Sequence, residues 1–202
     1  VVRAYNVRTG ALEWFWDPIP PGQQSQFDAE GKPVFRRGTT NVWSVISVDP
    51  GRKLVFLPTG NTSTDFFGGL RDNMDYYSSS VVALHADTGE LAWHFQMVHH
   101  DIWDYDTPAQ PTLFELERDG RTIPALAQPT KMGHLFILNR ETGEPLFPVE
   151  ERPVSLAGAI EGERYSPTQP FPANPAFIVR HELTREDIWG FTPWDKGKCL
   201  EM

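Results

Sequence analysis

Ala4-Tyr5-Asn6-Val7-Arg8-Thr9-Gly10-Ala11-Leu12-Glu13-Trp14 is the first of three related stretches in this chain. The second is Ala83-Leu84-His85-Ala86-Asp87-Thr88-Gly89-Glu90-Leu91-Ala92-Trp93, and a weaker third is Ile137-Leu138-Asn139-Arg140-Glu141-Thr142-Gly143-Glu144-Pro145-Leu146-Phe147. In each copy an apolar segment leads into a Thr-Gly turn, where glycine can adopt a positive φ, and a second segment with a large aromatic residue follows. Each copy therefore predicts a β-hairpin.

The spacing of the three hairpins indicates a radial repeat. Successive Thr-Gly turns are separated by one to two times the roughly 40 to 50 residues that a propeller blade occupies. We expect Trp14 and Trp93 to dock one sheet on the next. Further short strands, each bounded by Gly, Pro or Asp, are predicted at residues 41–48, 54–58, 79–84, 112–116 and 135–138. The pattern as a whole predicts an all-β fold, a partial β-propeller.

Two proline-rich segments and one capping signal complete the outline of the fold. Prolines concentrate in residues 17–33 and 150–175, which are too long for hairpin turns, so we interpret both segments as excursions over a face of the propeller. Helical periodicity is nearly absent. The exception is residues 184–189, where Thr184 can cap a short helical turn with Asp187 three residues later.

Composition narrows the class of ligand. The 202 residues carry a formal net charge of −9, and no run of Lys or Arg supplies the basic patch that a nucleic-acid-binding surface needs. The single cysteine, Cys199, excludes an intrachain disulfide and a thiolate metal cluster. The longest apolar run, residues 53–58, is far shorter than the ~20 residues of a membrane helix. We expect a small polar ligand, and a chain that is part of a longer protein.

Residues 98–111 contain two imidazoles, three carboxylates and two large aromatic side chains, a mixture that packing alone does not require. The imidazoles belong to adjacent residues, His99 and His100. In an extended strand adjacent side chains point to opposite faces, which disfavours a metal ion shared between them. One imidazole could instead orient a neighbouring carboxylate while the other packs or bonds within the sheet.

The three carboxylates of this segment are Asp101, Asp104 and Asp106. They lack the Gly and the distal Glu of an EF-hand calcium loop. Asp104 follows Trp103, and partial desolvation beside an aromatic ring raises the basicity of a carboxylate, so Asp104 is a candidate base for a substrate hydroxyl. The alternative is that these aspartates only accept hydrogen bonds from backbone amides of a turn.

Two further polar residues follow predicted strands. Asn61 offers a neutral carbonyl ligand for a hard cation, and Lys131 precedes a glycine turn. Taken singly, each is as well explained as an ordinary turn residue or a solvated lysine. Trp43, at the start of a predicted strand, would by default belong to the core.

Several longer motifs carry a family resemblance in addition to residues 98–111. They are Asn41-Val42-Trp43-Ser44, Pro58-Thr59-Gly60-Asn61, Phe66-Phe67-Gly68-Gly69, Tyr77-Ser78-Ser79-Ser80-Val81-Val82-Ala83-Leu84 and Arg164-Tyr165-Ser166-Pro167-Thr168-Gln169-Pro170-Phe171. Together they resemble the quinoprotein dehydrogenases that use pyrroloquinoline quinone (PQQ), and most closely their membrane-associated glucose/quinate/shikimate branch. The resemblance covers essentially the whole chain.

The resemblance implies a role for four residues. Trp43 is similar to the tryptophan on which the quinone stacks, and Asn61, eighteen residues later as in the family, is similar to a ligand of Ca²⁺ or Mg²⁺. Asp104, the second aspartate of the Asp-x-Trp-Asp element, looks like the catalytic base. Lys131 looks like the basic residue that binds the quinone and stabilises charge on its oxygen. His100 or Asp101 would then orient Asp104.

The resemblance also implies the architecture and setting of the parent protein. Residues 1–202 would form part of a single domain, about half of an eight-bladed propeller, with the other blades, the acidic metal ligand and the membrane segment outside this chain. The protein would face the periplasm at the bacterial inner membrane. The isolated chain is expected to be inactive and to self-associate through unpaired sheet edges.

The implied reaction is oxidation of a sugar or cyclic polyol, with electrons passed to ubiquinone. Glucose is the first expectation for the substrate, and quinate or shikimate is the alternative. A different class of function, a non-catalytic propeller that serves as an assembly scaffold, fits the repeats equally well. It does not explain why Trp43, Asn61, Asp104 and Lys131 occur together.

Overall fold

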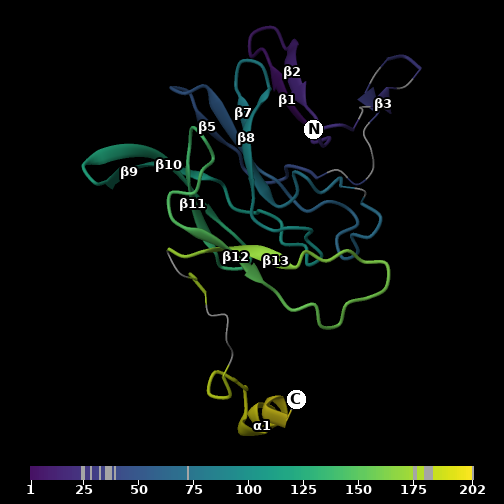
Figure 1. The fold of residues 1–202 in the computed structure, drawn as a ribbon, viewed down its shortest axis with the longest axis vertical. Coiled ribbons are helices and arrows are strands. Elements are labelled where there is room, and N and C mark those ends of the chain that lie inside the picture. Colours follow the sequence, from purple (N-terminus) through teal and green to yellow (C-terminus); the bar gives the residue numbers. More distant parts are fainter. Residues whose placement is uncertain are drawn as a thin grey trace.

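The computed structural model describes residues 1–23, 26–27, 29–31, 33–34, 38, 40–71, 73–174, 177–179 and 184–201. Its elements are almost all strands (Figure 1). In chain order they are β1 (Val2–Tyr5), β2 (Leu12–Trp16), β3 (Gln26–Phe27), β4 (Pro33–Val34), β5 (Ser47–Asp49), β6 (Leu54–Pro58), β7 (Ser80–His85), β8 (Leu91–Gln96), β9 (Thr112–Arg118), β10 (Arg121–Pro129), β11 (Leu135–Asn139), β12 (Val149–Pro153), β13 (Thr168–Pro172) and α1 (Pro193–Glu201).

The strands form consecutive antiparallel blades, which confirms the partial propeller. Strands β5-β6-β7-β8 make a four-stranded blade, and β9, β10 and β11 make the next, which a bridge between Leu138 and Pro145 extends. The hairpin β1-β2 precedes them, and β3-β4 and β12-β13 form separate two-stranded sheets. All three predicted hairpins are present, since the third closes at that bridge.

The described part of the chain contains fewer blades than half of an eight-bladed propeller. Consecutive Thr-Gly turns lie in consecutive blades, so each interval corresponds to one blade and not to two. The proline-rich segment at residues 17–33 lengthens the first interval. The other, at residues 150–175, follows the third turn and overlaps the hairpin β12-β13, which sequence patterns did not predict.

The boundaries of the predicted strands are mostly close to those observed. Residues 54–58 form β6 as expected, whereas the strand predicted at 41–48 is reduced to β5. Strand β10 was missed because it contains two prolines. Pro124 lies just before the pairing with β11 begins and Pro129 is the last residue of the strand, so neither occupies the doubly paired interior where proline is excluded.

A tryptophan joins each blade to the next, as predicted. Trp14 Nε1 donates to the carbonyl oxygen of Ala86 at 2.8 Å, and Trp93 Nε1 donates to that of Arg140 at 3.1 Å. Each indole ring lies against the glycine of the next Thr-Gly turn, Gly89 or Gly143. Glycine is required there twice over, because φ is positive and the ring leaves no room for a Cβ.

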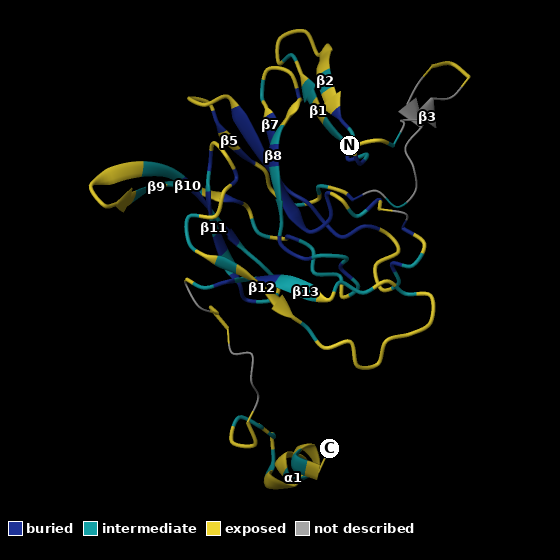
Figure 2. Ribbon diagram, viewed as in Figure 1, coloured by how far each residue is buried: buried dark blue, intermediate teal, exposed yellow. Residues whose placement is uncertain are grey.

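The first complete blade is buried on both faces, which explains its continuous apolar strands. Successive residues of β6 and β7 point to opposite faces. One face joins a core cluster with the following blade, consisting of Leu54, Phe56, Val81, Ala83, Trp93, Met97, Leu126, Phe136 and Leu138. The other face packs with the preceding hairpin in a second cluster of Trp16, Val55, Leu57, Tyr77, Val82 and Leu84. Figure 2 shows this buried centre and the exposed outer tips of the hairpins.

The C-terminal part of the described chain extends away from the sheets (Figure 1). The predicted turn at Thr184 is present, and the Thr184 hydroxyl donates to Asp187 Oδ2 at 2.7 Å. The same Thr-x-x-Asp signal at Thr192 and Asp195 begins α1, a helix that was not predicted. Within the described ranges, no helix has the length and apolar character required to cross a bilayer.

The docking contact predicts a difference between two glycines in equivalent turns. Gly10 and Gly89 both have positive φ, but a Cβ on Gly10 meets nothing within 4 Å, whereas one on Gly89 would lie 2.5 Å from the ring of Trp14. Gly10→Ala should therefore cost only the backbone strain of about 1–2 kcal/mol. Gly89→Ala should cost a further 1–3 kcal/mol or so for overpacking. Urea unfolding of both variants of the full-length protein measures the difference, and equal losses would contradict the docking role.

Candidate active site

Three loops at one edge of the two blades carry the predicted site residues. They follow β6 (residues 59–79), β8 (residues 97–111) and β10 (residues 130–134), and they supply Asn61, Asp104 and Lys131 in that order. Strands β6 and β8 are both antiparallel to β7, so their ends lie at the same edge. The 97–111 loop is tied down by Thr107 N, which donates to Thr59 O at 3.3 Å, and by Gln128 Nε2, which donates to Ala109 O at 2.9 Å.

Asp106 lies at the centre of the cluster that these loops form. Its Oδ1 accepts a hydrogen bond of 2.5 Å from Asn61 N, and its Oδ2 lies 3.5 Å from Lys131 Nζ. Lys131 Nζ also donates to the backbone oxygen of Asp104 at 2.7 Å and lies 3.7 Å from Asp104 Oδ2. The structure thus brings together three of the predicted residues, Asn61, Asp104 and Lys131, around a fourth that was not assigned a role.

Trp43 lies beside this cluster and is open to solvent. The expectation that it belongs to the core by default is wrong, since it precedes β5 and is 57% exposed. Gly60 connects it to the cluster, because a Cβ there would lie 3.2 Å from Trp43 Nε1 and 2.8 Å from both Asn41 Oδ1 and Asp106 Oδ1. Only glycine leaves these polar atoms this close together.

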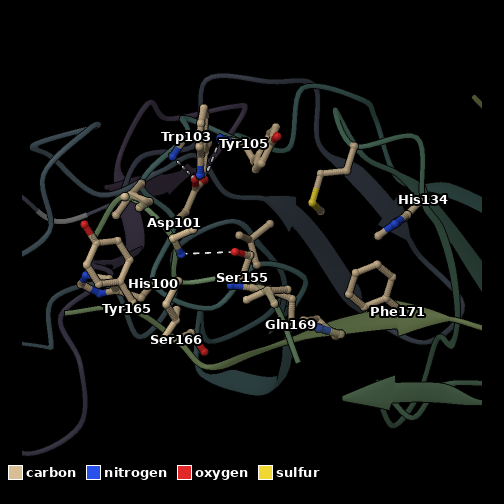
Figure 3. A pocket seen from close by; sticks show the side chains of 18 residues that line it. His100, Asp101, Trp103, Tyr105, His134, Ser155, Tyr165, Ser166, Gln169 and Phe171 are labelled. Carbon is tan, nitrogen blue, oxygen red and sulfur yellow. Dashed lines mark hydrogen bonds between the residues drawn. The ribbon is translucent and has the colours of Figure 1, made fainter. Parts of the chain in front are cut away.

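The backbone conformation of Asp104 is unusual and is held by its neighbour. Asp104 has φ of +58°, in the left-handed region that aspartate tolerates better than most residues. The buried Asp101 carboxylate accepts hydrogen bonds from Trp103 N at 2.9 Å and Tyr105 N at 2.7 Å, the residues on either side (Figure 3). Ser79 Oγ donates to the same carboxylate at 2.7 Å. Asp101 therefore fixes the turn that presents Asp104.

The surroundings of Asp104 favour its protonated form. Desolvation raises the pKa of Asp104 above its ordinary value, the negative charge of Asp106 adds to the rise, and Lys131 opposes it. A carboxylate with a raised pKa is a stronger base once it is ionised. The arrangement is suited to accepting a proton from a hydroxyl group beside a cationic side chain.

His100 and His99 do not join the cluster. His100 lies between two carboxylates, with Nδ1 at 2.6 Å from Asp75 Oδ2 and Nε2 at 2.8 Å from Glu163 Oε1. His99 instead lies near Gln96 and Glu151. The two imidazoles thus have separate partners.

Several residues of the site were not assigned a role from the sequence, namely Asn41, Gly60, Arg71, Asp75, Asp106 and Glu163. For Asp106 the only available signal was a second carboxylate two residues after the proposed base, because the segment is a turn with Asp104 at positive φ and not an extended strand. The partners of His100 lie 25 and 63 residues away in the chain, and no local pattern identifies them.

Comparison with known proteins identifies the family. The model for the PQQ glucose/ethanol/alcohol dehydrogenase beta-propeller domain matches residues 1–202. The chain belongs to this family. Its membership confirms the resemblance to quinoprotein dehydrogenases and accounts for the blades described above.

Relatives in this family carry several names. The chain is 41% identical to the glycerol dehydrogenase large subunit of Gluconobacter oxydans (strain 621H), over 98% of this chain and 27% of that protein. It is 42% identical to the quinate/shikimate dehydrogenase (quinone) of Acinetobacter baylyi, over 98% and 24%. It is 39% identical to the quinoprotein glucose dehydrogenase of Escherichia coli (strain K12), over 100% and 25%. The chain therefore spans about a quarter of the length of these relatives.

Solved structures of the family have the same fold. A europium-containing methanol dehydrogenase superposes with a TM-score of 0.60 at 25% identity, over 84% of this chain and 32% of that chain. The quinohemoprotein alcohol dehydrogenase ADHIIG of Pseudomonas putida HK5 superposes with a TM-score of 0.56 at 29% identity, over 76% and 25%.

Proposed function

We propose that the protein to which this chain belongs is a PQQ-dependent dehydrogenase that oxidises a hydroxyl group of a sugar or polyol, with Asp104 as the base. The observation that carries the proposal is the cluster in which Asp104, Lys131, Asp106 and Asn61 meet beside the open face of Trp43. A scaffold protein has no use for a carboxylate of raised pKa paired with a lysine beside an exposed tryptophan.

The residues present suit a planar, anionic quinone. The exposed Trp43 ring offers a face for stacking, and the absence of a side chain at Gly60 lets Asn41, Asp106 and Trp43 lie close together beside that ring. Lys131 supplies a positive charge next to Asp104 and Asp106. When bound, PQQ supplies an acceptor for a hydride from the substrate carbon.

Asp104 and Lys131 would divide the remaining work. Asp104 accepts the proton of the substrate hydroxyl, and its raised pKa makes the ionised carboxylate a stronger base for this step. Lys131 Nζ donates a hydrogen bond to the backbone oxygen of Asp104 and so holds the base in place. Its positive charge would also balance negative charge that develops on the bound quinone. Asp101 holds the turn and so sets the direction in which Asp104 points.

A divalent cation, Ca²⁺ or Mg²⁺, would bind among the oxygen atoms of this cluster. The donor set consists of carboxylates and amide oxygens, which suit a hard cation. Asp106 is the carboxylate nearest to Asn61, and we add it to Asn61 as a proposed ligand. Asn61 Oδ1 accepts hydrogen bonds from Thr62 N at 2.7 Å and Ser78 Oγ at 3.2 Å, so at least one of these bonds would have to give way for this oxygen to bind the cation.

The wider setting follows from the likeness to whole relatives. We propose that residues 1–202 are part of a single propeller domain that other segments complete, that the protein acts at the periplasmic face of the inner membrane, and that ubiquinone is the electron acceptor. Glucose is the first substrate to test. Quinate and glycerol are next, because relatives of nearly equal identity bear those names.

Reconstitution of the full-length protein tests the proposal. Apoprotein is titrated with PQQ in the presence of Ca²⁺ or Mg²⁺, binding is followed by absorbance, and dye reduction is measured with glucose, quinate and glycerol. We expect metal-dependent PQQ binding and turnover of at least one of these substrates. A protein that neither binds PQQ nor reduces the dye with any of them would instead support the scaffold function.

A further inference from the structure

The imidazole of His100 is bound on both sides by carboxylates. Nδ1 lies 2.6 Å from Asp75 Oδ2 and Nε2 lies 2.8 Å from Glu163 Oε1. The three side chains are largely withdrawn from solvent, with 11%, 14% and 1% of the His100, Asp75 and Glu163 side chains exposed. We call this group the His100 clasp.

The chemistry of the clasp requires a protonated imidazole. Carboxylates only accept hydrogen bonds, whereas a neutral imidazole has a single N–H to donate. Both bonds can therefore form together with ionised carboxylates only when His100 carries a positive charge. Hydrogen bonding to Asp75 raises the pKa of His100, and the His100 charge lowers the pKa of both Asp75 and Glu163 against the effect of their burial.

The clasp joins three loops that are distant in sequence. Asp75 belongs to the 59–79 loop, His100 to the 97–111 loop and Glu163 to the excursion between β12 and β13. Glu163 Oε2 also accepts a hydrogen bond of 2.6 Å from Gly68 N. A Cβ on Gly68 would collide with His100 Nε2, so glycine is needed for the imidazole to reach Glu163. Arg164 adds a contact of 3.3 Å from Nη1 to Asn73 Oδ1.

The clasp acts on the segment that presents the proposed base. His100 has φ of +46° and precedes Asp101, whose carboxylate holds the amides on either side of Asp104. Arg71 Nη1 donates to Asp101 O at 2.5 Å from the same loop as Asp75. The turn around Asp104 is therefore held by two adjacent residues. His100 binds it to Asp75 and Glu163, and Asp101 binds the amides of Trp103 and Tyr105 within it.

The clasp also holds the wall of a cavity. A cavity of about 350 Å³ lies between the 97–111 loop and the excursion. Trp103 and Tyr105 line it from the loop, and Ser155, Tyr165 and Phe171 line it from the excursion and β13 (Figure 3). His100 lies on the boundary where the two sides meet.

We propose that His100 is a positioning residue, whose charged clasp to Asp75 and Glu163 fastens the 154–167 excursion to the loop of Asp104 and keeps that loop in its active conformation. This inference rests on the proposed function for its effect on turnover, but its structural part stands independently. Residue His99 on the same loop lacks this role, because its bonds to Gln96 and Glu151 do not join the 59–79 loop.

The clasp has a defined dependence on pH. The charged or titratable groups around it are Asp65, Arg71, Asp75 and Tyr76 from the 59–79 loop, His94 from β8, Asp101 from the 97–111 loop, and Glu163 and Arg164 from the excursion. Because the pKa of folded His100 lies above the ordinary value of 6.5, its contribution is complete below that pH and is lost as pH rises through the folded value. The pKa values of Asp75 and Glu163 are lowered, so on acidification the clasp persists until the pH falls through those lowered values and the carboxylates become protonated.

Four variants of the full-length protein test the inference. His100→Gln and Glu163→Gln remove the charges of the clasp, and Glu163→Gln leaves the imidazole in place if the first variant folds poorly. His99→Gln and Glu151→Gln are matched controls, since this pair has the same chemistry 3.0 Å apart on the same loop and a more exposed strand. Hydrogen exchange of peptides covering 66–70, 101–106 and 155–165 is measured between pH 6 and pH 9, alongside kcat and KM.

We expect the two clasp variants to lose protection in all three peptides and to lower kcat by roughly 10- to 100-fold, with KM less affected. In the wild type the same peptides should lose protection as pH rises, and in Glu163→Gln this should occur at lower pH. The controls should match the wild type. If the wild type neither binds PQQ nor turns over substrate, the proposed function fails, but the hydrogen-exchange measurements still test whether the clasp holds the three loops together. Clasp variants that match the controls in exchange and kcat would overturn it.

Discussion

Replacing Asp104 by Asn in the full-length protein is expected to lower kcat by roughly 10²- to 10⁴-fold, the usual contribution of a general base. Asn has nearly the same shape and tolerates the positive φ of this position, so the turn should survive. It cannot accept a proton, and it removes the negative charge beside Lys131. Stopped-flow or steady-state dye reduction on PQQ-loaded protein measures the loss, and absorbance measures whether PQQ still binds.

Asp119 provides a matched control for this experiment. It has φ of +53° and its side chain is 90% exposed on the turn between β9 and β10, at the opposite end of β10 from Lys131. Asp119→Asn should leave kcat and PQQ binding unchanged. If Asp104→Asn retained wild-type kcat, the base would have to be another group, and Asp106 is the nearest carboxylate to test.

Replacing Trp93 by Ala is expected to lower the free energy of unfolding by about 3–5 kcal/mol, as for other large aromatic residues in a core. Trp93 is buried, lies 5.8 Å from Phe56 between ring centroids and docks on the Gly143 turn of the next blade. Truncation also leaves the Arg140 carbonyl without its 3.1 Å hydrogen bond. Urea unfolding of the full-length protein measures this loss. Far-UV circular dichroism is the suitable signal, because removing a tryptophan changes the intrinsic fluorescence.

Trp189 is the control for this loss, because it is 74% exposed before α1. Trp189→Ala should change the stability of the protein by no more than about 0.5 kcal/mol. Equal effects of the two substitutions would mean that the contact between blades does not depend on the docked indole, and the explanation of the repeat given above would fail.

The repeat and its consequences could be predicted from residues near one another in the chain. A Thr-Gly turn requires local backbone geometry, and in all three copies the threonine hydroxyl accepts a hydrogen bond from an amide two residues later, so each hairpin is specified within a dozen residues. The indole that ends each of the first two copies is large enough to need a partner, and it packs on the glycine of the next turn. Hairpins, blades and docking therefore followed from sequence. The strand with two prolines and the hairpin β12-β13 did not, because their pairing is allowed only by where neighbouring strands begin and end.

Some residues of the candidate site could likewise be predicted from the sequence, and others could not. Asp104 stands out in the sequence because it follows Trp103, and Lys131 stands out because it precedes a glycine turn. The structure brings the two together through a hydrogen bond from Lys131 Nζ to Asp104 O. The central place of Asp106, the exposure of Trp43 and the two carboxylates around His100 were decided by tertiary structure alone. Loops that are distant in the chain meet at these points, over separations of 25 to 63 residues. Local preferences act over a few residues, whereas these contacts depend on how one blade packs against the next, and only the packed cores establish that arrangement.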